Sequence, residues 1–464
     1  MVCVAFGAFM ASLDGSIVNV SLPTIARVFR LGSGEAASVI LSYLLSLSGC
    51  LLIFGRLGDV AGKRRVFLWG QGVFLLGSLA CGLAPGLASL VAARFFQGVG
   101  GAMLTVSSYA LISQVAPRDL LGWGIGILTT AVGLGATLGA PLGGFLTDWF
   151  SWRWVFYINL PVGAVSLYAS HAYLQREGAD RSPLDLRGLL RRFDVPGALF
   201  SFLGILLLVF GLNRGREEGW TSPLILGSLL GAGIALGLFA LAERRHPEPL
   251  LDRELLGRRG FRVPVLGSLP GYLFIGGNTL LLPFFLQGAK GLSAQGCGFA
   301  MLLFSGVYML LSGVGGRTSD RISPRILCAV SQVGAAGCCV LFASTLHVPG
   351  LLFPLLFLVG LGVANGFFYP PMGNLVLGGV PPEMRGSASG IFSVANRVCL
   401  TLGVCLYEAL FSQWAPGGIE APASALAGFR AAYLVAAALF VVGALWILLV
   451  PGKDALASTS PPSP

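Results

Sequence analysis

The sequence predicts an all-α integral membrane protein, and two observations carry this prediction. Only 11% of the 464 residues are charged, whereas 55% are hydrophobic, and the mean hydropathy is +0.82. A soluble domain carries roughly 25% charged residues, so this chain has too few charges to cover a water-facing surface of its size. Apolar stretches of about 20 residues, which are long enough to cross a bilayer, also recur along the whole chain.

By length and hydropathy, the sequence predicts fourteen transmembrane helices. They are expected at residues 2–27, 36–55, 66–84, 87–115, 121–147, 154–174, 193–212, 222–243, 261–288, 293–314, 325–345, 349–378, 386–410 and 425–450. Most connections between them are short, so consecutive helices are expected to run antiparallel.

The charged residues predict how these helices are oriented. The net charge is +10, and most of the 30 Lys and Arg residues fall in alternate loops, as the positive-inside rule requires. This placement favours membrane topology over nucleic-acid binding, so no nucleic-acid partner is expected. It puts both termini in the cytoplasm and supports an even number of spans, because a missed helix would invert the alternation downstream.

The nine Cys and three His residues show no spacing typical of metal ligands. Most of the Cys lie within apolar runs, where we expect them to pack as small apolar side chains. We therefore expect no metal, no cofactor and no catalytic group. A membrane enzyme such as a lipid-linked glycosyltransferase would need clustered acids, a metal or a phosphate site in a sizeable loop, and the predicted loops show none.

The chain also contains an internal repeat. Residues 117–127 (PRDLLGWGIGI) resemble residues 381–391 (PPEMRGSASGI), and Gly55–Asp59 resembles Gly316–Asp320. Six helices near the start thus correspond to six near the end. Transporters built from two parallel halves bind their substrate between the halves, near the middle of the membrane.

The repeat predicts how the chain divides into domains. An N-terminal six-helix bundle is expected at 1–174 and a C-terminal six-helix bundle at 261–450. Residues 175–260 are expected to hold cytoplasmic connectors and two inserted helices at 193–212 and 222–243, and the tail at 451–464 is expected to be disordered.

Four stretches carry a resemblance to a known family. Leu13–Pro23 (LDGSIVNVSLP) is close to LDxTIxNVALP, and Gly55–Arg65 (GRLGDVAGKRR) matches GxLaDrxGrk. Arg94–Gly101 (RFFQGVGG) is similar to RxxQGxGG. The glycines of Gly126–Gly144 are followed by Trp152–Gly163 (WRWVFYINLPVG), which looks like WxWxFxINxPxG. In this order, the sequence resembles the fourteen-helix drug:proton antiporter branch of the major facilitator superfamily over nearly the whole chain.

The resemblance implies a major facilitator fold with two six-helix bundles plus two inserted helices. It also implies a proton-coupled secondary transporter that exports amphipathic drugs or antiseptics by H+ antiport through alternating access. The energy source would be the proton gradient, and the partners would be protons, membrane lipid and a small lipophilic or cationic substrate. A monomer in the bacterial cytoplasmic (inner) membrane is expected. An exporter of a lipid or specific metabolite, a proton symporter, a membrane-embedded enzyme and a non-transporting sensor are the alternatives.

Polar residues inside the predicted spans are the candidates for proton coupling or substrate binding. They are Asp14, Asn19, Arg94, Gln97, Arg397 and Glu408. A charged, unpaired carboxylate at the bilayer centre costs on the order of 3 kcal/mol or more, so Asp14 and Glu408 are expected to face the protein interior. A carboxyl group that moves between dry and wet surroundings can bind and release a proton.

Each of these residues also has a structural interpretation. Asp14 could be hydrogen-bonded to helix neighbours such as Asn19, Arg94 could hold helices together through backbone carbonyls, and Glu408 could be a structural acid near the outer end. The fourth span has a polar stripe that we expect to face a cavity, made of Arg94, Gln97, Gly98, Gly101, Thr105 and Ser108.

The loop after the second span and its repeat after the tenth are predicted to form a gate. An acid beside basic residues can pair across the cytoplasmic helix ends in one state and release them in the other. The gate residues would be Gly55, Asp59, Gly62, Lys63, Arg64, Arg65, Asp320 and Arg321. The alternative is that the basic residues only set the topology.

The fifth span is predicted to pack closely and to bend. Its small residues permit close helix contact and its proline permits a kink; they are Gly135, Gly139, Pro141, Gly143 and Gly144. The related signature has Gly and Pro adjacent, whereas Ala140 separates them here, so the kink is expected to be displaced by one residue.

Overall fold

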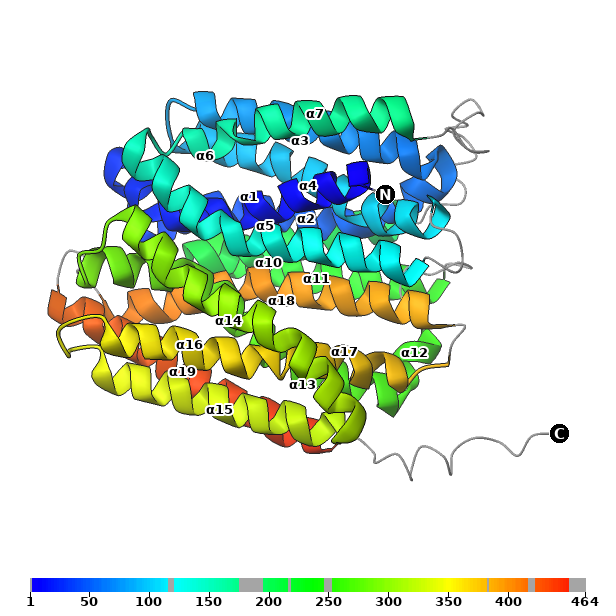
Figure 1. The fold of residues 1–464 in the computed structure, drawn as a ribbon. Coiled ribbons are helices and arrows are strands. Elements are labelled where there is room, and N and C mark those ends of the chain that lie inside the picture. Colours follow the sequence, from blue (N-terminus) through cyan, green and yellow to red (C-terminus); the bar gives the residue numbers. More distant parts are fainter. Residues whose placement is uncertain are drawn as a thin grey trace. The chain divides into compact units, whose positions relative to one another are not determined.

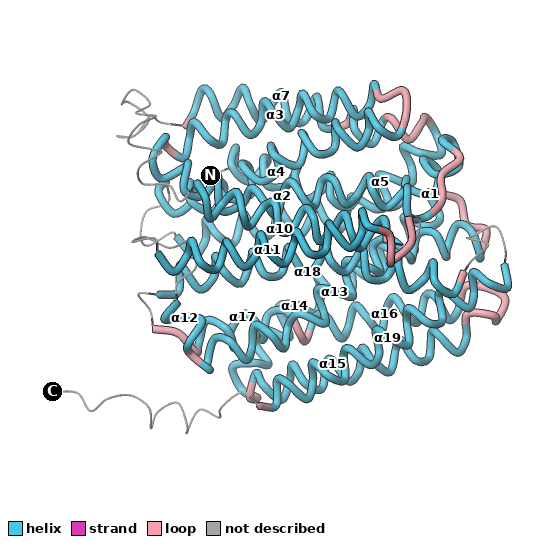
Figure 2. The backbone as a smooth tube through the Cα atoms, turned by 180° about the vertical axis from the view of Figure 1, so that it is seen from behind, coloured by secondary structure: helices cyan, strands magenta, loops and turns pink. Residues whose placement is uncertain are grey.

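The computed structural model describes residues 2–115, 121–174, 195–215, 218–245, 253–381, 384–415 and 422–449. Within these ranges all regular secondary structure is helical and no strand occurs (Figures 1 and 2). The expected connectors at 175–192 and the expected tail at 451–464 lie outside the described residues.

The helices follow one another with short connections. In the first part of the chain they are α1 (Val2–Phe29), α2 (Ser33–Ala61), α3 (Lys63–Leu83), α4 (Leu87–Val115), α5 (Leu121–Trp149), α6 (Trp154–Tyr157), α7 (Asn159–Tyr173), α10 (Val195–Arg214) and α11 (Pro223–Arg245). In the second part they are α12 (Arg253–Gly257), α13 (Arg259–Phe284), the π-helix η1 (Phe285–Ala289), α14 (Ala294–Arg321), α15 (Pro324–Thr345), α16 (Leu352–Gly366), α17 (Tyr369–Gly378), α18 (Arg385–Trp414) and α19 (Pro422–Leu448).

Among the described residues, 13 helical segments are long and apolar enough to cross a membrane. The remaining predicted span, the sixth at 154–174, is divided at Ile158 into α6 and α7, which are each too short to cross alone. Pro161 explains this break, because it cannot donate the backbone hydrogen bond that the Tyr157 carbonyl would accept in a continuous helix. The predicted all-α integral membrane fold is confirmed.

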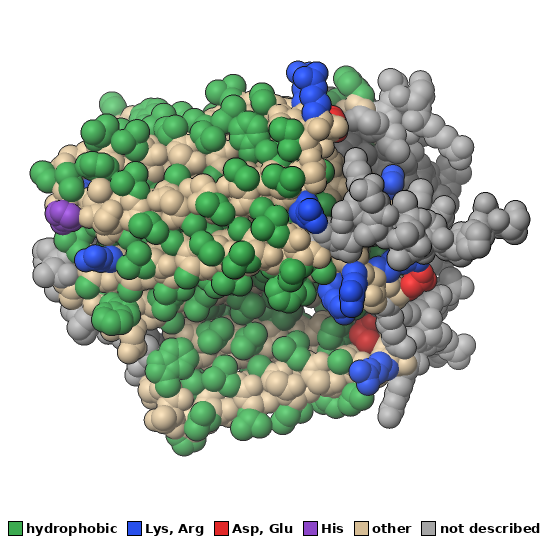
Figure 3. Space-filling model, turned by 90° about the horizontal axis from the view of Figure 1, so that it is seen from below, with side chains coloured by type: hydrophobic (Ala, Val, Ile, Leu, Met, Phe, Trp, Pro, Cys, Tyr) green, Lys and Arg blue, Asp and Glu red, His purple; other side chains and the backbone are tan. Residues whose placement is uncertain are grey.

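The surface agrees with a lipid environment. In Figure 3, hydrophobic side chains spread over the middle of the viewed face, whereas the visible charged side chains lie toward its ends. On α11, large apolar side chains such as Leu230 and Ile234 are 66% and 59% exposed. Apolar patches of this extent mark contact with lipid or with other proteins.

The chain forms two compact units. Unit 1 comprises Met1–Leu250 and Thr279–Leu302, and unit 2 comprises Leu251–Asn278 and Leu303–Pro464. The boundary therefore passes through α13 and α14, each of which contributes residues to both units.

The two inserted helices, α10 and α11, pack side by side within unit 1 (Figure 2). The Phe202 ring of α10 lies against Gly49 of α2, where a larger residue would collide with it. The same ring makes an edge-on contact with Phe95 of α4, at 6.1 Å between centroids. The insertion is thus anchored by α10 on α2 and α4.

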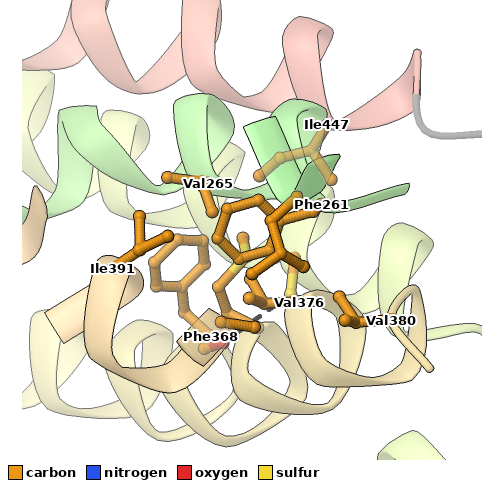
Figure 4. Packing of buried hydrophobic residues seen from close by; sticks show 11 residues of the cluster. Phe261, Val265, Phe368, Val376, Val380, Ile391 and Ile447 are labelled. Atoms are coloured by element: carbon orange, nitrogen blue, oxygen red, sulfur yellow. Dashed lines mark hydrogen bonds between the residues drawn. The ribbon is translucent and has the colours of Figure 1, made fainter. Parts of the chain in front are cut away.

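Unit 2 has a hydrophobic core near the start of α13, which we call the Phe261 core. Figure 4 shows Phe261 and Phe368 lying among Val265, Val376 and Ile391. Six helices (α12, α13, α15, α17, α18 and α19) and the connection between α16 and α17 contribute to it, together with Val380 just after α17. Its further buried members are Leu255, Cys328, Met372, Val380, Ala388 and Ile447.

Candidate functional site

The strongest candidate site is the carboxylate of Asp14, which lies midway along α1 and is 0% exposed. Arg94 Nη1 donates to Asp14 Oδ2 at 2.6 Å and forms an ion pair with it. Gln97 Nε2 and Asn159 Nδ2 donate to Oδ1 at 2.9 Å and 3.0 Å. Arg94 and Gln97 are three residues apart on α4 and so project from the same side of that helix, while Asn159 begins α7.

Arg94 is itself 2% exposed and has partners besides Asp14. Its Nη1 also donates to Gln97 Oε1 at 2.7 Å, and its Nε donates to the Val39 carbonyl at 3.4 Å. The guanidinium lies over the ring of Tyr43, 4.2 Å from the ring centroid. The positive charge is therefore held by a carboxylate, an amide and an aromatic face together.

A hydroxyl from α3 completes the arrangement. Ser78 Oγ accepts from Gln97 Nε2 at 2.7 Å and from Asn159 Nδ2 at 3.3 Å. We call Asp14, Tyr43, Ser78, Arg94, Gln97 and Asn159 the Asp14 network. It joins five helices of unit 1 in a buried set of charge-assisted hydrogen bonds. In such sites, removal of one charged partner costs about 3–5 kcal/mol, because the other charge is left buried and uncompensated.

The structure brings Asp14, Arg94 and Gln97 together, as their positions in apolar spans suggested. It does not bring Asn19 to Asp14, because Asn19 Nδ2 donates to the Gly15 carbonyl of its own helix at 2.9 Å. Arg94 is not held by backbone carbonyls alone, because its shortest contact is the ion pair with Asp14.

The polar stripe of α4 packs differently from the expectation of a cavity. A Cβ atom added to Gly98 would lie 2.5 Å from the Tyr43 carbonyl, and one added to Gly101 would lie 2.9 Å from Tyr43 Oη. These glycines let α2 approach closely, so this part of the stripe is a helix–helix contact.

Arg397 and Glu408 lie on α18 in unit 2. Glu408 is 4% exposed and Arg397 is half-buried. The Arg397 carbonyl accepts from Thr401 Oγ1 at 3.0 Å. Their roles in proton coupling or substrate binding stay predictions.

The predicted gate lies where α2 ends and α3 begins. Gly55 and Asp59 are on the last turns of α2, and the side chain of Asp59 is outside the described part of the chain. Gly62 has φ +95° and donates to the Gly58 carbonyl; this left-handed conformation favours glycine. Lys63 begins α3, and the Arg65 guanidinium reaches the end of α2. The gate stays a prediction.

Arg64 makes a specific contact with another helix end. Its side chain is buried, with Nε donating to the Leu174 carbonyl at 2.8 Å and Nη2 to the His171 carbonyl at 3.1 Å. These carbonyls lie at the C-terminal end of α7, where a positive charge is favourable. In unit 2, Asp320 and Arg321 are exposed at the end of α14.

The glycines of α5 contact two different helices. Gly135, Gly139 and Gly143 face α1, and a Cβ atom on Gly139 would lie 2.6 Å from Ser16 Cβ. The Ser16 hydroxyl donates to the Ala136 carbonyl of α5 at 2.9 Å. This face holds α5 against the helix that carries Asp14.

Pro141 and Gly144 lie on the side of α5 that contacts α14. Gly144 is in contact with the backbone of Ala294, and a Cβ on Gly298 would lie 2.9 Å from Pro141 Cα. Close packing by the α5 glycines is thus present on both sides of the helix, within unit 1.

Polar contacts fasten the end of α5 to the same region. Asp148 Oδ2 accepts from the Gln295 backbone N–H at 2.7 Å, and Trp149 Nε1 donates to Gln295 Oε1 at 3.2 Å. In addition, Gln287 Nε2 donates to the Val20 carbonyl of α1 at 2.7 Å. Residues 279–302 are therefore attached to α1 and α5 by both backbone and side-chain contacts.

The described residues hold no group of three or more His, Cys, Asp or Glu side chains that could bind a metal ion. The side chains of the Asp14 network can bind a proton, form an ion pair and exchange hydrogen bonds. Asn159, Ser78 and Tyr43 are members of the network that were not predicted from the sequence. Asn159 carried a signal, because it is a polar residue in an apolar stretch, inside the segment Trp152–Gly163 that supports the family resemblance.

Comparison with known proteins defines the class. The family model of the Major Facilitator Superfamily matches residues 4–404 and 265–464. The multidrug resistance protein Stp of Mycobacterium tuberculosis is 33% identical over 429 residues, which cover 90% of this chain and 77% of that protein. The riboflavin transporter RibZ of Clostridioides difficile is 29% identical over 418 residues, covering 89% and 88%. The putative multidrug resistance protein MdtD of Escherichia coli is 30% identical over 405 residues, covering 87% and 84%.

Solved structures show the same fold. A POT family transporter has a TM-score of 0.71 at 14% identity, with 99% of this chain and 96% of that chain covered. The nucleoside transporter NupG has a TM-score of 0.68 at 14% identity, with 97% and 99% covered. The fold and the relatives thus define a multi-pass membrane transporter and not an enzyme. The chain belongs to the Major Facilitator Superfamily, as its sequence motifs predicted.

Proposed function

We propose that the chain is a proton-coupled secondary transporter that exports amphipathic compounds by H+ antiport through alternating access. The observation that carries the proposal is the buried ion pair of Asp14 and Arg94. The proposed site of action is the bacterial cytoplasmic membrane, with both termini in the cytoplasm, in keeping with the distribution of Lys and Arg.

The proposed coupling step is the protonation of Asp14. A proton on Asp14 removes the negative charge that the Arg94 guanidinium faces at 2.6 Å. Arg94 then keeps the Gln97 amide oxygen and the Tyr43 ring as partners, which are already 2.7 Å and 4.2 Å away. Because these neutral partners lower the cost of an unpaired guanidinium, the network has two bonded arrangements, one for each protonation state.

Such a two-state element is what coupling requires. A ligand shifts a conformational equilibrium only by its differential affinity for the two states, and here the ligand is the proton. Asp14 lies on the helix that packs against α5, so a change in the network acts on the α1–α5 contact. Conversion between the states would then open the substrate site first to one side of the membrane and then to the other.

The test is transport by purified protein in proteoliposomes with an imposed pH gradient. Replacing Asp14 by Asn keeps the hydrogen-bonding shape but prevents proton binding, so gradient-driven transport should fall to background while substrate counterflow persists. The matched control is Glu243→Gln, which neutralises an acid of α11 that is 6% exposed and lies outside the Asp14 network. Gradient-driven transport at the wild-type rate in Asp14→Asn would refute the proposed role.

The second candidate is an exporter of a specific metabolite, or a proton symporter. It is favoured by the similarity to the riboflavin transporter RibZ. The direction of substrate movement separates antiport from symport. With the pH gradient imposed in each sense, an antiporter moves substrate against the proton flow and a symporter moves it with the flow.

A further inference from the structure

In unit 2, the helical chain is interrupted between α16 and α17. The helix stops at Phe367 and Phe368, and α17 resumes immediately before two prolines, Pro370 and Pro371. Pro371 cannot donate to the Phe367 carbonyl, and the Ser331 hydroxyl donates to that carbonyl instead, at 3.0 Å. At membrane depth, interrupted helices occur where the backbone is buried in protein or lines a cavity, and several transporters build substrate sites from them.

Aromatic side chains gather at this interruption. The ring of Tyr369, the first residue of α17, lies 5.1 Å from the ring of Tyr272 on α13 and 6.0 Å from that of Tyr308 on α14. Tyr272 also lies 6.3 Å from the ring of Phe392 on α18. We call these four residues the tyrosine cluster. Their spacing is within the range of direct aromatic contact.

The cluster lies near the middle of the spans and is reachable. Tyr272 and Tyr308 are near the centres of the spans Arg259–Ala289 and Ala294–Arg321. The side chains of the cluster are partly exposed, whereas Phe261 and Phe274, on the same helix as Tyr272, are each 1% exposed. Aromatic faces that remain accessible at this depth can stack on a bound molecule.

The region also contains polar atoms that lack partners. Among the described residues, no hydrogen-bond partner exists for the buried hydroxyl of Tyr369, for the side-chain nitrogen of Asn365 or for the side-chain oxygen of Asn396. Asn365 and Asn396 are 4% and 8% exposed. Asn396 follows Phe392 by one helical turn, and Asn365 immediately precedes the interruption. Buried polar groups are nearly always paired, so two donors and one acceptor in this part of unit 2 lack the partners that a bound ligand could supply.

The support beneath the cluster is rigid. Tyr369 and Phe392 pack directly against the Phe261 core. On the other side, a Cβ atom added to Gly271 would lie 3.6 Å from Tyr369 Oη, so this hydroxyl reaches α13. A site of this kind is preorganised, which lowers the entropy that binding must overcome.

The charge near the cluster is positive. Arg397 lies five residues after Phe392 on α18, directly after Asn396, and is half-buried. A cationic ligand stacked on Tyr272 would be repelled by Arg397 in this low-dielectric region. The positive charge of Arg397 therefore favours an uncharged ligand over a cation.

We propose that the tyrosine cluster binds an uncharged planar heteroaromatic ring system whose edge carries hydrogen-bond acceptors and a donor. The rings stack on the ligand, and Tyr369, Asn365 and Asn396 pair with its edge. This inference rests on the proposed transport function, because it assigns the substrate class of that transporter.

The test is equilibrium binding to the full-length protein in nanodiscs, without a proton gradient. The probes are riboflavin and lumichrome, which are uncharged and planar, and ethidium, which is planar and cationic. Quenching of flavin fluorescence reports stacking. Tyr272→Leu removes a stacking ring and should weaken riboflavin binding by about tenfold. Tyr369→Phe removes only the hydroxyl and should weaken it by about fivefold.

The matched control is Tyr407→Phe. Like Tyr369, Tyr407 belongs to unit 2 and has a buried hydroxyl with no partner among the described residues, but it lies outside the cluster. This variant should bind riboflavin as the wild type does. The inference is overturned if neither uncharged probe binds, if ethidium binds more tightly than both, or if the Tyr272 and Tyr369 variants bind like the control.

Failure of this inference can be told apart from failure of the proposed function. Binding is measured without a gradient, so it does not depend on Asp14. Gradient-driven transport that is lost in Asp14→Asn but insensitive to Tyr272→Leu would leave the proposed function standing and refute the tyrosine cluster. Intact riboflavin binding without proton-driven transport would support the tyrosine cluster and refute the proposed proton-coupled function.

Discussion

At the scale of single residues, the Asp14 carboxylate is shared among donors from two other helices. Its oxygens accept from Arg94 on α4, from Gln97 one turn further along α4, and from Asn159 on α7. Hydrogen bonds to a charged group contribute about 1.5–3 kcal/mol each, so three of them can offset much of the cost of burying the charge. The arrangement is consequently sensitive to each donor.

Asn159→Ala should destabilise the protein and impair proton-driven transport, because it takes one donor from Asp14 and one from Ser78. The expected loss is about 1–3 kcal/mol in the free energy of unfolding, visible as a lower thermal transition in detergent. Asn213→Ala is the matched control, since among the described residues that amide makes only a long contact of 3.5 Å with the Gly34 carbonyl. Equal thermal shifts in the two variants would contradict the structural role of Asn159.

Part of this site could be predicted from the sequence. Asp14, Arg94 and Gln97 are conspicuous because charged and amide side chains are costly in apolar spans. Ser78 and Tyr43 were not predictable, since Ser and Tyr are common in such helices and the pairing of helices is not encoded in their periodicity. The meeting of Tyr272 and Tyr308 with Tyr369 could not be predicted for the same reason, because tyrosines far apart in sequence meet only through the packing of α13, α14 and α17.

At the scale of elements, α5 has two packed faces with different partners. Gly135, Gly139 and Gly143 lie against α1, whereas Gly144 lies against the start of α14. Gly133 lies on the same helix with no atom within 4 Å of an added Cβ. The same substitution on the same helix should therefore have opposite effects at different positions.

Gly139→Ala should destabilise the protein by about 1–3 kcal/mol, because the new methyl group would force α1 and α5 apart. Gly133→Ala should be neutral or stabilise it by up to about 1 kcal/mol, since alanine favours helix more than glycine does. Thermal unfolding of both variants in the same detergent checks the sign. A stabilising effect of Gly139→Ala would show that the α1–α5 contact is looser than described.

The spans themselves were predictable, and the breaks within them were not. Hydropathy places α4 at its observed bounds, because a run of apolar residues must cross the bilayer as a helix. In two other spans, the apolar run continues through Ile158 and through Phe367, although the helix is broken at each of these residues. These breaks depend on Pro161 and Pro371 and on neighbouring side chains such as Ser331. A proline can equally lie inside a continuous helix, as Pro23 does in α1.

At the scale of the whole molecule, two units share helices α13 and α14. The part of these helices at 279–302 is attached to α1 and α5, while the remainder belongs to unit 2. The π-helix η1 follows α13 directly in this attached part, and π-helical turns are often found at functional sites. A movement of unit 2 relative to unit 1 must therefore bend or shift these two helices.

The presence of one carboxylate in the Asp14 network has an electrical consequence. If Asp14 carries one proton inward per cycle and the cargo leaving is uncharged, each cycle moves one net positive charge into the cell. The membrane potential then contributes about 2.3 kcal/mol per 100 mV to export. For a cargo with a single positive charge, the exchange is electroneutral and this contribution vanishes.

Voltage alone should therefore drive an uncharged cargo and leave a singly charged one unmoved. In proteoliposomes clamped by valinomycin and potassium gradients, with equal pH on both sides, riboflavin transport should rise with the imposed potential and ethidium transport should not. An equal response of the two cargoes would rule out the exchange of one proton for one molecule. On this basis, a cell that loses its pH gradient but keeps its membrane voltage would still expel uncharged compounds.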